Sequence, residues 1–204
     1  MTARTHPGSP ILVMDHSVIT LREGGDPGGR ETAFLSLYDI AFHATMGAGR
    51  VALVSVPAAG LDAIFTDRLE LGRAMAARLR GMGMTTPMLS REPLVVTDLW
   101  RDPWIDAWFG YRFRAPGVEV TARWEDLDAP LFAEGPNGGF SEREDIWSLF
   151  VGARSATITV NGARAPGAPF DDGAWLPKLG RALSSAHAAL GETRITPSTE
   201  RRPG

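Results

Sequence analysis

The sequence predicts a mainly β (α+β) fold, an antiparallel β-barrel or curved sandwich with one inserted helix. Three observations favour this class. Short apolar runs rich in β-branched and aromatic residues alternate regularly with Gly/Pro-rich loops. Residues 109–124 alternate aromatic and polar side chains, as expected of a hairpin with one buried face. Helical periodicity is clear only over residues 67–82, and nothing indicates repeated βαβ units.

The pattern of apolar residues in the first half of the sequence predicts several strands. Apolar runs at 11–14 and 17–21 read as two short strands, with Asp15 and His16 in a turn between them. The segment 32–45 is mostly apolar on both of its alternating faces, which is typical of a strand covered on both sides. Compact strands are expected at 50–56 and 94–97.

One segment has clear helical spacing, and a second is compatible with a helix. The first spans residues 67–82, where Asp67 can cap the helix and Glu70 stands at capping-box spacing. Its apolar stripe consists of Leu71, Met75, Leu79 and Met82. Residues 178–190 are compatible with a C-terminal helix, although two adjacent serines weaken that interpretation.

The hairpin prediction fixes a register. If residues 116–117 form the turn, Arg114 faces Glu119 and Phe109 faces Trp124. Polar side chains then oppose polar ones on one face of the hairpin, and apolar side chains oppose apolar ones on the other. The predicted buried face consists of Phe109, Tyr111, Phe113, Val118, Val120 and Trp124. A second hairpin is predicted at Asn161-Gly162, since both residues tolerate a positive φ.

Composition sets the class of protein and its partners. The 204 residues, 44% hydrophobic and 22% charged, predict one domain over 10–196 with flexible ends at 1–9 and 197–204. A net charge of -3 without a basic tract argues against a nucleic-acid partner. No apolar signal region and no stretch near the roughly 18 apolar residues of a membrane span are present, so we expect a cytoplasmic protein without a membrane partner.

Several chemistries lack the residues they need. The chain has no cysteine, which removes thiolate ligands and nucleophiles, and Lys178 is the only lysine. The preference for arginine, with much Ala, Gly and Pro, is typical of a GC-rich bacterial genome. No two of the four histidines have metal-ligand spacing, and the glycine runs lack the P-loop lysine. No metal site or cofactor is therefore identified.

The aromatic cluster is the main functional candidate, and it reads equally as a packed core or as a cavity wall. On the cavity interpretation, the protein binds a small apolar or aromatic molecule, as barrels of about eight strands often do. A barrel with such a cavity resembles, in general style, the lipocalin-like folds. The ligand-binding residues would be Trp104, Trp108, Tyr111, Phe113 and Trp124, with Arg112 at the rim.

Two alternatives remain open. One is a lyase, isomerase or hydrolase using general acid–base chemistry from His43, Asp39 and His187, since imidazole suits proton transfer near neutral pH. His43 and Asp39 would share one face of the strand 32–45, about 13 Å apart. The other alternative is a homodimer whose aromatic surface is the interface.

Overall fold

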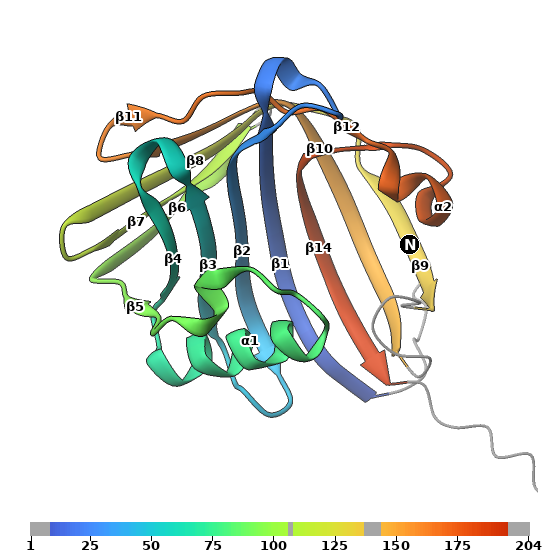
Figure 1. The fold of residues 1–204 in the computed structure, drawn as a ribbon. Helices are drawn as coiled ribbons and strands as arrows, with labels where there is room; N and C mark the ends of the chain where they lie inside the picture. The colour runs from blue at the N-terminus through green and yellow to red at the C-terminus, as the bar shows by residue number, and fades with distance from the viewer. Residues whose placement is uncertain (1–8, 106–107, 137–143, 196–204) are drawn as a thin grey trace, which may run out of the picture.

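One curled sheet forms a half-barrel, which confirms the predicted β-rich class (Figure 1). The computed structural model describes residues 9–105, 108–136 and 144–195, so most of both predicted flexible ends lies outside the described residues. The main sheet has the strand order β5-β4-β3-β2-β1-β14-β10-β8-β7-β6, and β9 and β11 also pair with β10. A small second sheet pairs β12 with β13.

The strands are β1 (Ser9–Arg22), β2 (Glu31–His43), β3 (Gly49–Val56), β4 (Leu61–Thr66), β5 (Leu94–Val95), β6 (Asp98–Ile105), β7 (Trp108–Ala115), β8 (Val118–Leu127), β9 (Leu131–Pro136), β10 (Glu144–Val160), β11 (Ala163–Arg164), β12 (Asp171–Asp172), β13 (Leu183–Ser184) and β14 (Ala186–Ile195). The helices are α1 (Leu69–Gly81) and α2 (Leu176–Leu179), with short 3-10 turns η1 (Glu23–Gly25), η2 (Pro57–Ala59), η3 (Pro87–Ser90) and η4 (Gly173–Trp175). Among the described residues, no helix has the length and apolar character needed to span a membrane.

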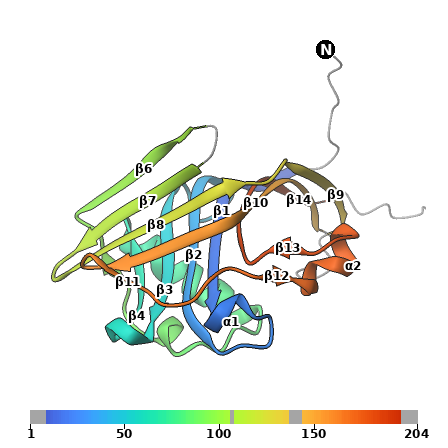
Figure 2. The same cartoon turned by 90° about the horizontal axis from the view of Figure 1, so that it is seen from above.

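The long strand β10 makes the sheet fold over itself. Its first part pairs with β14 and β9, and its second part pairs with β8. The strands β6, β7 and β8 therefore lie across the inner face of β1 to β4, while α1 lies on the opposite, outer face (Figure 2). The strand β2 is thus covered on both sides, as its two apolar faces predicted.

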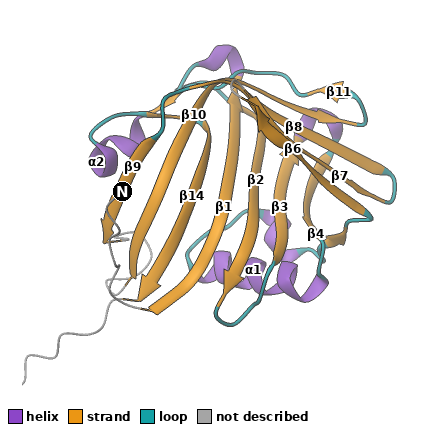
Figure 3. Ribbon diagram, turned by 180° about the vertical axis from the view of Figure 1, so that it is seen from behind, coloured by secondary structure: helices purple, strands orange, loops and turns teal. Residues whose placement is uncertain are grey.

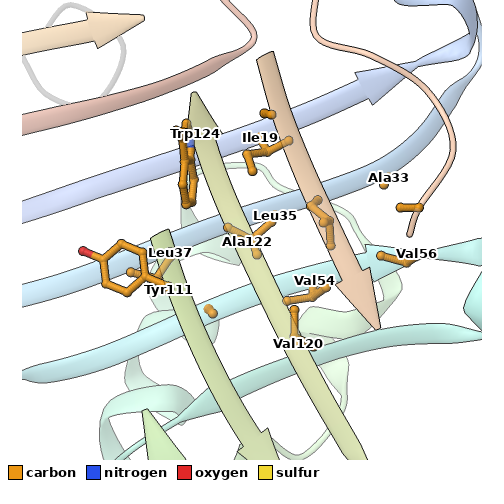
Figure 4. Close-up of a cluster of buried hydrophobic side chains, with 14 of the residues drawn as sticks. Ile19, Ala33, Leu35, Leu37, Val54, Val56, Tyr111, Val120, Ala122 and Trp124 are labelled. Carbon is orange, nitrogen blue, oxygen red and sulfur yellow. The ribbon is translucent and has the colours of Figure 1, made fainter. Parts of the chain in front are cut away.

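The inner core lies between these two layers (Figure 4). Phe109, Tyr111, Phe113 and Trp124 are fully buried, and the rings of Phe109 and Trp124 stack with centroids 4.7 Å apart. The indole Nε1 of Trp124 donates a hydrogen bond to the backbone oxygen of Val18 over 2.8 Å. The aromatic hairpin therefore fastens one layer of the half-barrel to the other.

Both predicted hairpins are confirmed. Strands β7 and β8 pair Arg114 with Glu119 and Phe109 with Trp124, in the predicted register, although Val118 is only half-buried. Gly117 takes φ 79°, which the two-residue turn requires. The second hairpin turns at Asn161-Gly162 with φ 51° and 81°, the left-handed values of a type I′ turn.

Helix α1 packs through three of the four residues of the predicted stripe, since Leu71, Met75 and Leu79 are buried, whereas Met82 is the exposed C-cap. The predicted cap is wrong. Arg68 occupies the N-cap without a side-chain hydrogen bond, and the Asp67 carboxylate instead accepts the backbone N–H of Arg50 over 2.9 Å. The aspartate thus joins β3 to the turn before the helix.

Truncation of Leu79 should measure this outer core. Leu79→Ala is expected to lower the free energy of unfolding by about 2–5 kcal/mol, because the side chain is buried against the sheet. Met82→Ala, at the exposed helix end, is the matched control and should cost below about 1 kcal/mol. Equal losses for the two variants in denaturant unfolding would contradict the packing of α1.

Two predicted elements are corrected. The strand β1 runs unbroken through Asp15 and His16, which were expected in a turn, because β2 and β14 pair with it on both sides. The helix over 178–190 is wrong, since α2 ends at Leu179 and β14 begins at Ala186. The small side chains of Ala186 and Ala188 are fully buried in the middle of the sheet, where pairing on both edges overrides helical propensity.

Candidate functional site

Part of the inner face lies beyond the covering strands β6 to β8, on β9, β10, β14 and the adjoining ends of β1 and β2 (Figure 3). Strand register places two rows of side chains across it. The tryptophan row consists of Phe42, Val13, Glu192, Trp147 and Glu134. The aspartate row consists of Arg50, Asp39, Asp15, Leu190, Leu149 and Phe132. Together the two rows are called the open inner face.

Large apolar side chains are exposed on the open inner face. Val13, Phe42, Phe132 and Trp147 are each 36% to 46% exposed. The rings of Phe132 and Trp147 meet edge to face with centroids 5.3 Å apart. A hollow in the surface adjoins them, lined by Glu134, Gly135, Asp145, Ile146, Trp147, Glu192 and Arg194. Exposed apolar groups gathered on one concave surface are typical of a binding site.

Asp15 is buried where the open inner face meets the covering strands. One carboxylate oxygen accepts hydrogen bonds from Arg101 over 2.6 Å and from the Tyr111 hydroxyl over 3.2 Å, and the other accepts one from Ser17 over 2.9 Å. Burial nevertheless raises the pKa of the Asp15 carboxyl, and the facing Asp39 adds to this rise, against the lowering by Arg101 and the two hydroxyls. The group is therefore able to take up a proton more readily than an exposed aspartate.

The neighbouring charges are paired. Asp39 lies directly opposite Asp15 on β2 and forms an ion pair with Arg50 over 3.1 Å. Glu192 forms a similar pair with Arg194 over 2.7 Å. Each of these carboxylates thus has a guanidinium beside it.

Two histidines are packed on the outer face. The His16 ring stacks on Tyr38 with centroids 4.3 Å apart, and its Nε2 bonds the Ser36 hydroxyl over 2.8 Å. Burial, together with the neighbouring His187, lowers the pKa of His16 to about 3. His187 donates from Nδ1 to the backbone oxygen of Ser184 over 2.8 Å, and burial lowers its pKa as well. Both rings are therefore neutral near pH 7.

The structure does not bring the three predicted catalytic residues together. A β-bulge in β2 skips Ala41, so that His43 pairs with Leu12 on the outer face while Asp39 pairs with Asp15 on the inner face. The Nδ1 of His43 accepts the backbone N–H groups of Thr45 and Met46 and so holds the turn after β2. His187 is also on the outer face, edge-on to Trp175. Only Asp39 reaches the open inner face.

The predicted ligand-binding residues are separated as well. Tyr111, Phe113 and Trp124 are fully buried in the inner core. Trp108 and Arg112 lie on the other side of the hairpin, where the Arg123 guanidinium covers the Trp108 ring at 4.0 Å from its centroid. The side chain of Trp104 lies outside the described residues.

The open inner face depends on residues that sequence reasoning passed over. The sequence predicts a turn at Asp15, and Arg101 carries no local signal because its partner is 86 positions away. Within the described residues, no group of three or more His, Asp or Glu side chains is placed to hold a metal ion. No protein-family model, curated protein or solved structure matches this chain at a significant level.

Proposed function

We propose that the protein binds a small apolar or aromatic molecule on the open inner face. The observation that carries this proposal is the exposure of four large hydrophobic side chains, Val13, Phe42, Phe132 and Trp147, on adjoining rows of one concave surface. A ligand that covers them removes apolar surface from water, which contributes about 25 cal/mol per Å².

The local structure supports binding by an existing surface. Val13 on β1 and Trp147 on β10 lie in strands paired on both edges, whereas Phe42 and Phe132 each pair on one edge, so most of the backbone under the ligand is fixed before binding. A preformed surface has less ordering entropy to lose when the ligand binds. Trp147 lines the hollow, and its edge-to-face contact with Phe132 extends the aromatic surface beside it.

Tryptophan fluorescence and thermal unfolding test this proposal with 1-decanol, naphthalene and a steroid as probes. At least one probe is expected to raise the melting temperature and to change the emission. Trp147→Gln should raise the Kd for that probe by about tenfold or more, since burial of such a ring is worth about 1.5–3 kcal/mol. Trp100→Gln, on the exposed outer surface of β6, is the matched control and should leave Kd unchanged.

Two results would overturn the proposal. One is the absence of any response to all three probes. The other is a dimer in analytical ultracentrifugation that Trp147→Glu dissociates, because the open inner face would then be covered by a second copy of the chain.

A further inference from the structure

The aspartate row changes character along its length. Arg50, Asp39 and Asp15 form a polar end on β3, β2 and β1, and Leu190, Leu149 and Phe132 form an apolar end on β14, β10 and β9. Neighbouring strands are about 4.8 Å apart, so the apolar end extends roughly 14 Å from Asp15. The row is thus shaped for a molecule with one polar and one apolar end.

Arg101 bounds the polar end from β6. Its Nη2 donates to Asp15, and its guanidinium carbon lies 5.4 Å from the centroid of the Tyr111 ring. The Arg101 side chain is 30% exposed, whereas that of Asp15 is 5% exposed. A ligand arriving on the open inner face therefore meets the guanidinium rather than the carboxylate.

In the second ion pair at the polar end, Arg50 with Asp39, the arginine is again more exposed than the aspartate. The Arg50 side chain is 34% exposed and that of its partner Asp39 is 21% exposed. A guanidinium has five N–H donors in a planar fork, so one bond to an aspartate leaves donors for a ligand. Planar anions such as carboxylates fit this fork with two parallel hydrogen bonds.

We infer that the ligand is a single-chain amphipathic anion, such as a medium-chain fatty acid, whose head group binds Arg101 and whose chain lies along Leu190, Leu149 and Phe132. This inference rests on the proposed function and adds the chemical class of the ligand. The length of the apolar end matches a chain of about ten carbons rather than a long lipid, by the strand spacing.

The buried carboxyl of Asp15 should modulate this binding. An ionised Asp15 repels an anion at Arg101, while its protonated form leaves the guanidinium to the ligand. The groups facing Asp15 are Asp39 from β2, Arg101 from β6 and Tyr111 from β7, and Leu190 faces it from β14. Affinity for a permanently charged head group is therefore expected to rise as the pH falls toward the raised pKa of Asp15.

The test compares four probes of equal chain length, decanoate, decane-1-sulfonate, 1-decanol and decylamine, by isothermal titration calorimetry. Decanoate and the sulfonate are expected to bind the wild type at least about tenfold more tightly than the other two, the gain of one charge-assisted pair. Arg101→Gln should remove this preference and leave the affinity for 1-decanol unchanged. The control is Arg154→Gln, which breaks an ion pair with Asp128 outside the two rows of the open inner face and should change no affinity.

Removal of Arg101 alone leaves the buried Asp15 carboxylate without its cation, which destabilises the folded state. The double variant Asp15→Asn/Arg101→Gln avoids this buried charge and is expected to bind 1-decanol but to show no preference for anions. Equal affinities for all four probes, or a preference for decylamine, would overturn the anionic head group while the proposed function stands. Failure of every probe to bind the wild type would instead overturn the proposed function itself.

Discussion

Trp124→Ala is expected to lower the free energy of unfolding by about 3–5 kcal/mol, the range for a large aromatic removed from a core. The indole is fully buried between the two layers of the half-barrel and stacks on Phe109. Its loss leaves a cavity and also leaves the backbone oxygen of Val18 without its side-chain donor. Urea unfolding at pH 7, followed by far-UV circular dichroism, measures the change.

Two further variants separate the contributions of the ring. Trp124→Phe keeps most of the packing and removes the N–H donor, so it should cost about 1–3 kcal/mol. Trp100→Ala removes an indole that is 58% exposed and should change stability by about 0.5 kcal/mol or less. A Trp124→Ala loss as small as that of Trp100→Ala would show that the two layers are not held together through this side chain.

Between pH 7 and pH 5 the folded protein should lose about 1–2 kcal/mol of stability through His16 alone. In the unfolded chain a histidine has a pKa near 6.5, whereas burial lowers the pKa of His16 to about 3 in the folded protein. Below pH 6.5 the unfolded chain therefore binds the proton and the folded one does not. Stability falls by up to about 1.4 kcal/mol per pH unit until the pH reaches the folded pKa.

Comparison with His16→Gln isolates this effect. Glutamine keeps a hydrogen-bonding group near Ser36 but does not titrate, so the variant should lose less stability than the wild type between pH 7 and pH 5. The raised pKa of Asp15 acts in the opposite direction, because protonation of that carboxyl favours the folded state. The Asp15 carboxyl is present in both proteins, so its contribution cancels when the two stability changes are subtracted. Parallel stability curves for the two proteins would contradict a buried, neutral His16.

The parts of the fold that were predicted correctly are those with local causes. In the hairpin of β7 and β8, two alternating arms and a Pro-Gly turn lie within a short stretch, and one register satisfies both faces. Asn161-Gly162 likewise forms its turn through the φ preferences of two adjacent residues. The stripe on α1 is set by helical spacing alone.

The errors arise where distant residues decide the local structure. Asp15 and His16 interrupt an apolar run and resemble a turn, yet Arg101 and Ser36, far away in sequence, supply their partners on opposite faces of β1. The segment 178–190 has helix-favouring alanines, but its second half fills the space between β1 and β10. Neither strand can be predicted from its neighbouring residues in the sequence alone.

Only part of the candidate site could be predicted from the sequence. The aromatic hairpin was rightly expected to have one buried face, but whether that face lines a cavity depends on what packs against it, and β1 to β4 pack there. The bulge at Ala41 reverses the side of the sheet that His43 faces, and a strand pattern without a partner cannot reveal a bulge. Trp147 is exposed on the first part of β10, whereas the covering strand β8 pairs with β10 only from Ala153 onward.

The place of β14 in the sheet has a consequence for synthesis of the protein. Strand β14 lies between β1 and β10, so that Ser9 pairs with Ile195 across most of the chain. Until residues 186–195 have left the ribosome, β1 and β10 each present an open edge, and no strand pairing joins the two halves of the sheet. We therefore expect folding to complete only after translation of this strand, slowly because its contacts are non-local. During that interval the unpaired edges of β1 and β10 are expected to favour edge-to-edge aggregation of the nascent chain.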